Sequence, residues 1–200
     1  GNEARIPPPL TQIGAKLRPE WLNRVLYDRE RVRPYMETRM PHYGEIALKD
    51  LPALFAEVDH LGPITGPKYL PPDPDEPSDP DDLSAQDREL RNKMRTGAQQ
   101  LLGDTGLNCI SCHNFNGTES QGMKGLDLMT SFQRLQPKWF DRYMRNPAAF
   151  RPGIIMPNYW PDGKATQTTI LDGNTDLQIK ALWDTLSLGR SARDPSGLRS

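Results

Sequence analysis

Hydrophobic positions recur at helical spacing in the stretch 84–103. One face of this stretch carries small or apolar residues at every turn: Leu90, Met94, Gly97, Ala98 and Leu101. Ser84 followed by Asp87 resembles a capping box, and Gly103 is placed to end the helix. The pattern therefore predicts an amphipathic helix with one buried face.

A second amphipathic helix is predicted near the end of the chain. Thr175 with Gln178 gives another capping box before an apolar face, and Gly189 closes the stretch. That face consists of Ile179, Leu182, Trp183 and Leu186. Gly97 costs about 1 kcal/mol relative to Ala inside a helix. We therefore expect another helix to cross close to it, and this last helix is the expected partner.

A shorter helix is expected to begin at Pro137 and to end before Pro147, since proline is tolerated only in the first turn of a helix. Its apolar face holds Trp139, Phe140, Tyr143 and Met144. The loop 114–125, rich in glycine and polar residues, is expected to lack regular structure. Together these patterns predict an all-α fold.

Two parts of the chain repeat one another. Residues 10–43 include Leu17-Arg18-Pro19-Glu20-Trp21-Leu22-Asn23-Arg24, and residues 128–159 include Leu135-Gln136-Pro137-Lys138-Trp139-Phe140-Asp141-Arg142. The segments stay in register up to Met40-Pro41-His42-Tyr43 and Met156-Pro157-Asn158-Tyr159, where the offset shifts by two residues. Residues 51–55 then align with residues 179–183. This pattern predicts a tandem repeat.

The repeat defines the expected domain organisation. Residues 1–58 form a partial copy, residues 59–83 a connector, residues 84–189 a complete copy, and residues 190–200 a tail. The connector is rich in proline and aspartate, which favours an extended path without a core. An acidic docking strip for a basic partner is the alternative reading of it.

The motif Cys109-Ile110-Ser111-Cys112-His113 carries the strongest chemical signal. It contains both cysteines of the chain, and Cys-x-x-Cys-His is typical of covalent c-type haem attachment. Each thiol would bond a haem vinyl carbon, and the His113 imidazole would ligate the iron. A redox dithiol or disulfide, or part of a metal site, remains an alternative, although His42 and His60 are isolated.

A haem iron with one histidine needs an open position or a second axial ligand. Met156 lies in the proline-containing loop 151–159 and is the best placed methionine for that role, with ordinary core packing as its alternative. Arg151 is expected either to pair with a haem propionate or to be solvated. Trp139 is expected to be a core aromatic residue, a haem-edge contact or both. Met40, the counterpart of Met156 in the partial copy, is expected to be a relic ligand.

These motifs resemble the class I cytochrome c family over residues 84–189, and residues 5–58 resemble the latter half of a second such domain. The resemblance implies a small helical bundle around one haem, with crossing terminal helices. It implies Cys109 and Cys112 as attachment points, His113 as proximal ligand and Met156 as distal ligand. Trp139, Arg151 and Tyr159 are further candidate cofactor-binding residues. The partial copy departs from the family because it has the methionine loop without the attachment motif. The doubled arrangement resembles bacterial dihaem cytochromes and cytochrome modules fused to periplasmic oxidoreductases.

Composition narrows the remaining choices. A mean hydropathy of −0.71 and 20 prolines predict a small core and many loops. No apolar run reaches membrane-spanning length, and a net charge of −1 gives no reason to expect nucleic acid. We expect a soluble chain exported to the periplasm, where haem attachment takes place. The chain shows no signal peptide at Gly1, which is also expected of a processed fragment.

Electron transfer is the function these expectations favour. The chain would pass single electrons on one haem c to redox partner proteins or to an associated oxidoreductase, without being an enzyme itself. A dihaem peroxidase-like subunit, whose first haem motif lies upstream, is the alternative. That reading needs a displaceable distal ligand near an acid or base, and no histidine lies close to Met156 in sequence.

Overall fold

The structure is a computed structural model that describes residues 9–60 and 84–199, apart from residues 32, 34, 35, 37, 124 and 152. Most of the connector expected at 59–83, together with Pro34 and Pro152 of the repeated segments, lies outside these described residues. The described residues form α- and 3-10 helices, and their few backbone pairings of the β type are isolated bridges. The all-α prediction is confirmed at this level.

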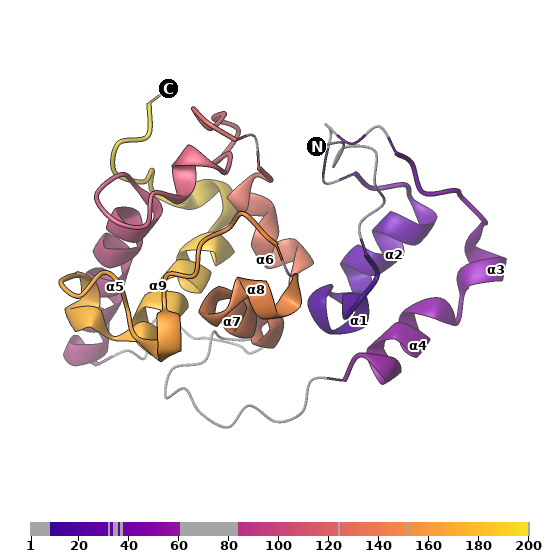
Figure 1. The fold of residues 1–200 in the computed structure, drawn as a ribbon, viewed down its shortest axis with the longest axis horizontal. Coiled ribbons are helices and arrows are strands. Elements are labelled where there is room, and N and C mark those ends of the chain that lie inside the picture. The colour runs from indigo at the N-terminus through magenta and orange to yellow at the C-terminus, as the bar shows by residue number, and fades with distance from the viewer. Residues whose placement is uncertain are drawn as a thin grey trace. The chain divides into compact units, whose positions relative to one another are not determined.

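The chain divides into two compact units, which are described separately. Unit 1 comprises residues 1–63 and takes in residues 133–136, while unit 2 comprises residues 64–132 and 137–200. The colours of Figure 1 separate the N-terminal helices, in indigo to magenta, from the later helices.

The described part of residues 1–63 in unit 1 forms the helices α1 (Ile13–Lys16), α2 (Pro19–Tyr27), α3 (Glu45–Leu48) and α4 (Leu51–Val58). Proline at the first position of α2 has no N–H to lose, and Trp21, Leu22 and Leu26 form its buried face. α1 packs against α4 so closely that a Cβ on Gly14 would meet the Phe55 carbonyl. The Gly14 amide donates to Asp59 Oδ2 at 2.9 Å. Glycine at position 14 therefore allows two helix backbones to meet.

Residues 133–136 complete unit 1 through backbone pairing. Leu17 and Leu135 form an antiparallel bridge. Arg18 N donates to Arg134 O, and Gln136 N donates to Lys16 O, both at 2.9 Å. The Gln136 side-chain amide also donates to Gly14 O at 2.7 Å and to Leu17 O at 3.0 Å. Arg18 Nε donates to Leu135 O at 3.1 Å as well, so several hydrogen bonds hold the end of α1 to a segment far along the chain.

The segments that match in sequence form helices of equal length at the same offset. α1 starts at residue 13 and α6 (Ser131–Arg134) starts 118 positions later at residue 131. α2 starts at residue 19 and α7 (Pro137–Arg145) again starts 118 positions later, at residue 137. The packing corresponds as well: α2 contacts α4, and α7 contacts α9 (Thr175–Ser187).

Unit 2 is built on α5 (Ala85–Leu102) and α9, which pack against each other as Figure 1 shows. The expected apolar faces are buried: Met94, Ala98 and Leu101 on α5, and Ile179, Leu182, Trp183 and Leu186 on α9. Trp183 is fully buried, with its ring 5.1 Å from Phe132 and 4.9 Å from Phe140 between centroids. Leu171 in η5 (Ile170–Gly173) covers part of α5.

Two details of these helices differ from the prediction. A Cβ on Gly97 would meet the side chain of Leu171 at 2.8 Å, so the close approach at Gly97 is to η5 and not to α9. α9 is capped by Asn174, whose side chain accepts from Leu177 N, whereas Thr175 donates to Gly163 O. The sequence predicted Thr175 as the cap, and both residue types suit that position. The Ser84 cap and the end of α5 at Gly103 are confirmed.

Shorter elements connect these helices. η3 (Leu128–Thr130) leads into α6, and α7 ends before Pro147 as predicted, although that proline then begins α8 (Pro147–Phe150). η4 (Pro161–Gly163) and η5 precede α9, and η6 (Gly189–Ser191) follows it. Beyond η6, Ser196 N donates to Gln99 O and Ser196 O accepts from Asp104 N, which fastens residues 190–199 to the end of α5.

Candidate functional site

The motif Cys109–His113 lies in one tight turn directly after α5. Asn108 adopts a left-handed conformation with φ 55°, which re-aims the chain into the 3-10 helix η2 (Cys109–Ser111). Cys112 N and His113 N both donate to Cys109 O, at 3.1 and 2.9 Å. Both cysteines are free thiols. The turn therefore holds two thiols and an imidazole on a single short loop.

The Cys109 thiol lies in an apolar environment. Its Sγ is 3.9 Å from Leu101 O at the end of α5. The pKa of Cys109 is raised to about 12, mainly by burial. A backbone hydrogen bond partly opposes the shift, and the neighbouring Cys112 adds a smaller rise. A redox dithiol or a nucleophilic cysteine works as the thiolate, and a lowered pKa favours that form. The pKa of Cys109 is raised instead, which disfavours the thiolate.

The His113 ring is oriented by the backbone. Nδ1 lies 3.1 Å from Leu126 O, and a carbonyl can only accept, so Nδ1 carries the proton. Burial lowers the pKa of His113, while the bond to Leu126 partly opposes that shift, so the ring stays neutral. A neutral ring protonated at Nδ1 leaves the Nε2 lone pair available, as a metal-ligating histidine requires.

Two glycines allow the following loop to close on this turn. A Cβ on Gly125 would lie 2.5 Å from Cys112 O and 2.8 Å from His113 Nδ1. A Cβ on Gly122 would lie 2.6 Å from Ser111 O. Because any side chain at these positions would displace backbone or imidazole, glycine is required for the loop to hold the ring.

Met156 and Tyr159 lie on the loop that follows α8. Ile154 N donates to Arg151 O across a turn in which Gly153 has φ 76°, and Met156 is partly buried. Burial raises the pKa of Tyr159 to about 12, and the charges of Cys109 and Cys112 add to the rise. Tyr159 therefore lies within electrostatic range of both cysteines.

Trp160 anchors this loop to α9. Its Nε1 donates to Gln178 Oε1 at 2.9 Å, and Gln178 Nε2 donates to Gln167 O and Ile170 O. Gln178 is fully buried, so all three of its polar contacts are made away from water. The position of the methionine loop is thereby tied to the core of unit 2.

The other two predicted site residues have different surroundings. Trp139 is buried in an aromatic cluster, with its ring stacked on Tyr143 at 4.5 Å and edge-on to Phe150 at 5.5 Å. Arg151 is exposed at the end of α8. The core reading of Trp139 is therefore observed directly.

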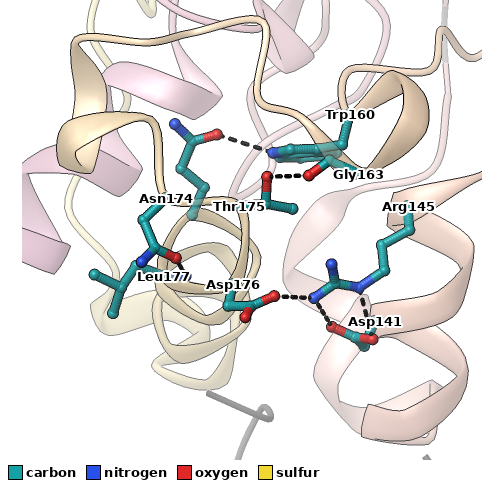
Figure 2. Close-up of polar contacts among 9 residues, drawn as sticks. Asp141, Arg145, Trp160, Gly163, Asn174, Thr175, Asp176 and Leu177 are labelled. Carbon is teal, nitrogen blue, oxygen red and sulfur yellow. Dashed lines mark hydrogen bonds and ion pairs between the residues drawn. The ribbon is translucent and has the colours of Figure 1, made fainter. Parts of the chain in front are cut away.

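A polar network supports the start of α9. Figure 2 shows Arg145 between Asp141 and Asp176, with the Asp141 contacts at 3.1 Å. Asp141 is fully buried, so the two carboxylates balance Arg145 where α7 meets α9. A hollow of about 460 Å³ beside this network is lined by Arg145, Lys164, Thr168 and Asp176 among others, and by none of the predicted site residues.

Sequence reasoning missed the groups that orient His113. Leu126 acts through its backbone carbonyl, so its side chain gives no signal, and Gly122 and Gly125 were noted only as loop residues. Three glycines between positions 117 and 125, close after the motif, were the available signal.

Within the described ranges, no group of three or more His, Cys, Asp or Glu side chains is arranged to hold a metal ion. No helix among the described residues is both long enough and apolar enough to cross a membrane. Across known proteins, no family model, curated protein or solved structure matches this chain.

Proposed function

We propose that this chain is a c-type cytochrome that transfers single electrons through one covalently bound haem c. Cys109 and Cys112 are the attachment points, His113 is the proximal ligand and Met156 is the distal ligand. The observation that carries the proposal is the hydrogen bond that His113 Nδ1–H donates to Leu126 O, on a turn that also holds two free thiols. Such a ring can bind iron through Nε2.

The donor set fits this cofactor. Thioether formation needs two unpaired thiols at a fixed spacing, and both cysteines are free. Iron ligation needs a neutral imidazole, and burial lowers the pKa of His113. When bound, haem supplies the one-electron change between ferric and ferrous iron. The chain itself would hold His113 and Met156 in place and would exclude water from the haem.

The methionine loop supports the distal role of Met156. Tyr159 of the loop lies within electrostatic range of both cysteines, and Trp160 fixes the loop to α9 through Gln178. A thioether opposite an imidazole gives a pair that raises the reduction potential and suits electron transfer. Anchoring the loop to the core would hold the Met156 thioether in a fixed position for a bound haem.

The finer fold assignment belongs to the same proposal. Packing between α5 and α9, an attachment turn after α5 and a methionine loop before α9 agree with the class I cytochrome c resemblance. The partners would be redox proteins or an associated oxidoreductase, and the compartment would be the periplasm. Electron transfer itself requires no catalytic side chain.

The raised pKa of Cys109 argues against this residue as the attacking thiolate of a redox dithiol. A redox-active cysteine pair depends on a stabilised thiolate. Burial raises the pKa of Cys109 to about 12, so at neutral pH this residue is held as the thiol. That state suits a haem attachment point better than it suits a nucleophile.

The test is pigment that cannot be extracted. Protein produced with a haem-attachment system should show a Soret band that stays with the polypeptide after acid–acetone extraction. Replacing both cysteines, with Cys109→Ala and Cys112→Ala, should make the pigment extractable, whereas Ser111→Ala should leave it attached. Colourless wild-type protein, or pigment lost to acidified solvent, would contradict the proposal.

A further inference from the structure

The Gln178 side chain is fully buried on α9, and its hydrogen bonds allow its amide only one orientation. Trp160 Nε1 carries a hydrogen and can only donate, so the Gln178 atom 2.9 Å from it is the oxygen. The Gln178 nitrogen then donates to two carbonyls, Gln167 O at 2.7 Å and Ile170 O at 2.8 Å. Gln178 therefore uses its oxygen and both amide hydrogens inside the core of unit 2.

Trp160 connects Gln178 to the methionine loop. It lies four residues after Met156 and is 1% exposed, so packing holds its ring as well as the hydrogen bond. Trp160 N also donates to Asn158 Oδ1 at 3.0 Å, which tightens the chain just after Met156. The loop and α9 are thereby joined by a buried contact close to the proposed distal ligand.

Gln167 continues this network towards the attachment turn. Its backbone carbonyl accepts from Gln178, and its side-chain Nε2 donates to Gly106 O at 3.0 Å. Gly106 lies three residues before Cys109. A Cβ on Gly106 would collide with the Gln100 carbonyl, so this residue lies directly against the end of α5. Gln167 thus contacts both α9 and the segment that leads into the thiol-bearing turn.

Backbone hydrogen bonds hold the stretch from Gly106 to His113. Asn108 N donates to Gly103 O at 3.0 Å, which fastens the start of this stretch to the end of α5. His113 N donates to Cys109 O at 2.9 Å, which fixes its end. The position of Gly106 is therefore passed on to the His113 ring through a chain segment that is tightly held.

We infer that Gln178 and Gln167 are positioning residues, which together set the separation between the Met156 loop and the turn that carries His113. Each of these two segments bears one proposed iron ligand, and the two glutamines link them through side-chain hydrogen bonds. Groups behind the ligands orient them and tune the metal centre. The inference rests on the proposed ligation by His113 and Met156, and it assigns the chain groups that place those ligands.

Gln178→Leu tests the inference in the haem-loaded protein. Leucine keeps a side chain of similar size, but it leaves Trp160 Nε1 without this acceptor and two carbonyls without this donor. Added imidazole can bind the ferric iron only when Met156 is displaced, and in Gln178→Leu it should bind about tenfold faster than in wild type. Amides of residues 154–160 should also exchange roughly tenfold faster, as measured by mass spectrometry.

Ile179→Val is the control for a general loss of core packing. Ile179 is the fully buried neighbour of Gln178 on α9, and the substitution removes one methylene without changing a hydrogen bond of the network. The rate of imidazole binding and the exchange of residues 154–160 should both stay close to wild type. An Ile179→Val variant that matches Gln178→Leu in both measurements would show that core packing alone places the loop, and would overturn the inference.

Gln178→Glu separates hydrogen bonding from side-chain volume. A protonated carboxyl at position 178 can accept from Trp160 and donate to one carbonyl, whereas a carboxylate would face Gln167 O and Ile170 O with no hydrogen to donate. Burial raises the pKa of a carboxyl group. The imidazole-binding rate relative to wild type at the same pH should therefore be near one at low pH and should rise with pH. A ratio that does not change with pH would overturn the inference.

Gln167→Ala tests the other end of the network at a side chain that is only half-buried, so folding is less at risk. Imidazole binding should again become several-fold faster, and exchange of residues 106–108 should rise. Gln99→Ala is the matched control, because Gln99 Nε2 donates to Asp194 O at 3.1 Å, a carbonyl outside both ligand segments. Imidazole binding to Gln167→Ala at the wild-type rate would overturn the inference.

The wild-type ferric spectrum separates this inference from the proposed function. Without the long-wavelength band of methionine ligation, the proposed role of Met156 fails, and the inference fails with it. With that band present in wild type, wild-type rates in Gln178→Leu and Gln167→Ala would overturn the positioning role alone.

Discussion

At the scale of single residues, the His113 ring is held by backbone groups on both sides. Leu126 O accepts a hydrogen bond from Nδ1–H, and Gly125 leaves just enough room for the ring. A methyl group at position 125 would lie 2.5 Å from Cys112 O and 2.8 Å from Nδ1. Neither neighbour can move without disturbing the attachment turn.

Gly125→Ala is therefore expected to rotate the imidazole and weaken iron ligation, with a cost in unfolding free energy of about 1–3 kcal/mol from overpacking. Denaturant unfolding and the low-spin ferric spectrum would measure both effects. Gly117→Ala is the matched control, because Gly117 has φ 85° with nothing within 4 Å, so alanine there adds backbone strain of about 1 kcal/mol without touching His113. A Gly125→Ala spectrum identical to wild type would contradict the role assigned to this contact.

Met156 is the residue whose role depends most on its loop. Met156→Ala is expected to open the sixth iron position and to lower the reduction potential by on the order of 0.1 V, within the ~0.8 V range that axial ligands control. A redox titration and the long-wavelength ferric band would report the change. Met123→Ala, at a 48% exposed methionine of the preceding loop, is the control and should change neither. An unchanged potential in Met156→Ala would direct the search to another methionine.

Asp184 on α9 is expected to make the free energy of unfolding depend on pH. Burial raises its pKa above the ordinary value of 3.8, and Lys180 at 2.7 Å together with Arg91 only partly opposes the shift. Between the unfolded and the raised folded pKa, the folded state binds more protons, so the free energy of unfolding falls as pH rises through that window.

The pH profile of Asp184→Asn should show this loss. Relative to wild type, Asp184→Asn should become progressively more stable as pH rises from 3.8 through the window, and the difference should be constant above it. Lys180→Gln removes a charge that favours the carboxylate, so its window should extend to higher pH. Urea unfolding at a series of pH values measures both variants, and parallel profiles for Asp184→Asn and wild type would refute the assignment.

At the scale of elements, hydrophobic periodicity predicted the buried faces of α5, α7 and α9 because each face repeats over several turns. Helix ends were less predictable. Asn174 and Thr175 are adjacent and both suit an N-cap, so only the backbone conformation decides between them. The contact of Gly97 with Leu171 could not be predicted from the sequence either. Leu171 and Asp172 in η5 have left-handed backbone conformations, which hydrophobic periodicity does not indicate.

The α9 cap can be tested by substituting its two candidates. Asn174→Ala removes the side chain that accepts from Leu177 N and should cost about 1 kcal/mol of unfolding free energy. Thr175→Ala removes an exposed hydrogen bond to Gly163 O and should cost about half as much. Urea unfolding of the two variants ranks them, and a larger loss for Thr175→Ala would restore the cap that the sequence predicted.

At the scale of the whole molecule, sequence matching predicted two related segments. The helices α1 and α2 begin and end at positions that correspond to those of α6 and α7. The pairing of residues 133–136 with α1 was not predicted. The hydrogen bonds by which Arg18 and Gln136 make this pairing are accepted by backbone carbonyls around Leu17 and Leu135, and backbone groups are the same at every residue. The Cys109–His113 motif could be recognised in the sequence because its side chains are chemically distinctive. The role of Leu126 O could not be predicted, because it too is a backbone group.

Gln136 is the side chain on which this part of unit 1 depends most directly. Its amide donates to Gly14 O at 2.7 Å and to Leu17 O at 3.0 Å, so Gln136→Ala leaves two carbonyls at the end of α1 without that donor. With about 1 kcal/mol for each lost bond, the variant should lose about 2 kcal/mol of stability in unit 1. Amide exchange of residues 13–18 should accelerate accordingly, while that of α5 and α9 should not. Gln133→Ala, at an exposed glutamine of the same segment, should leave exchange unchanged, and equal effects of the two substitutions would show that backbone pairing alone holds the segment.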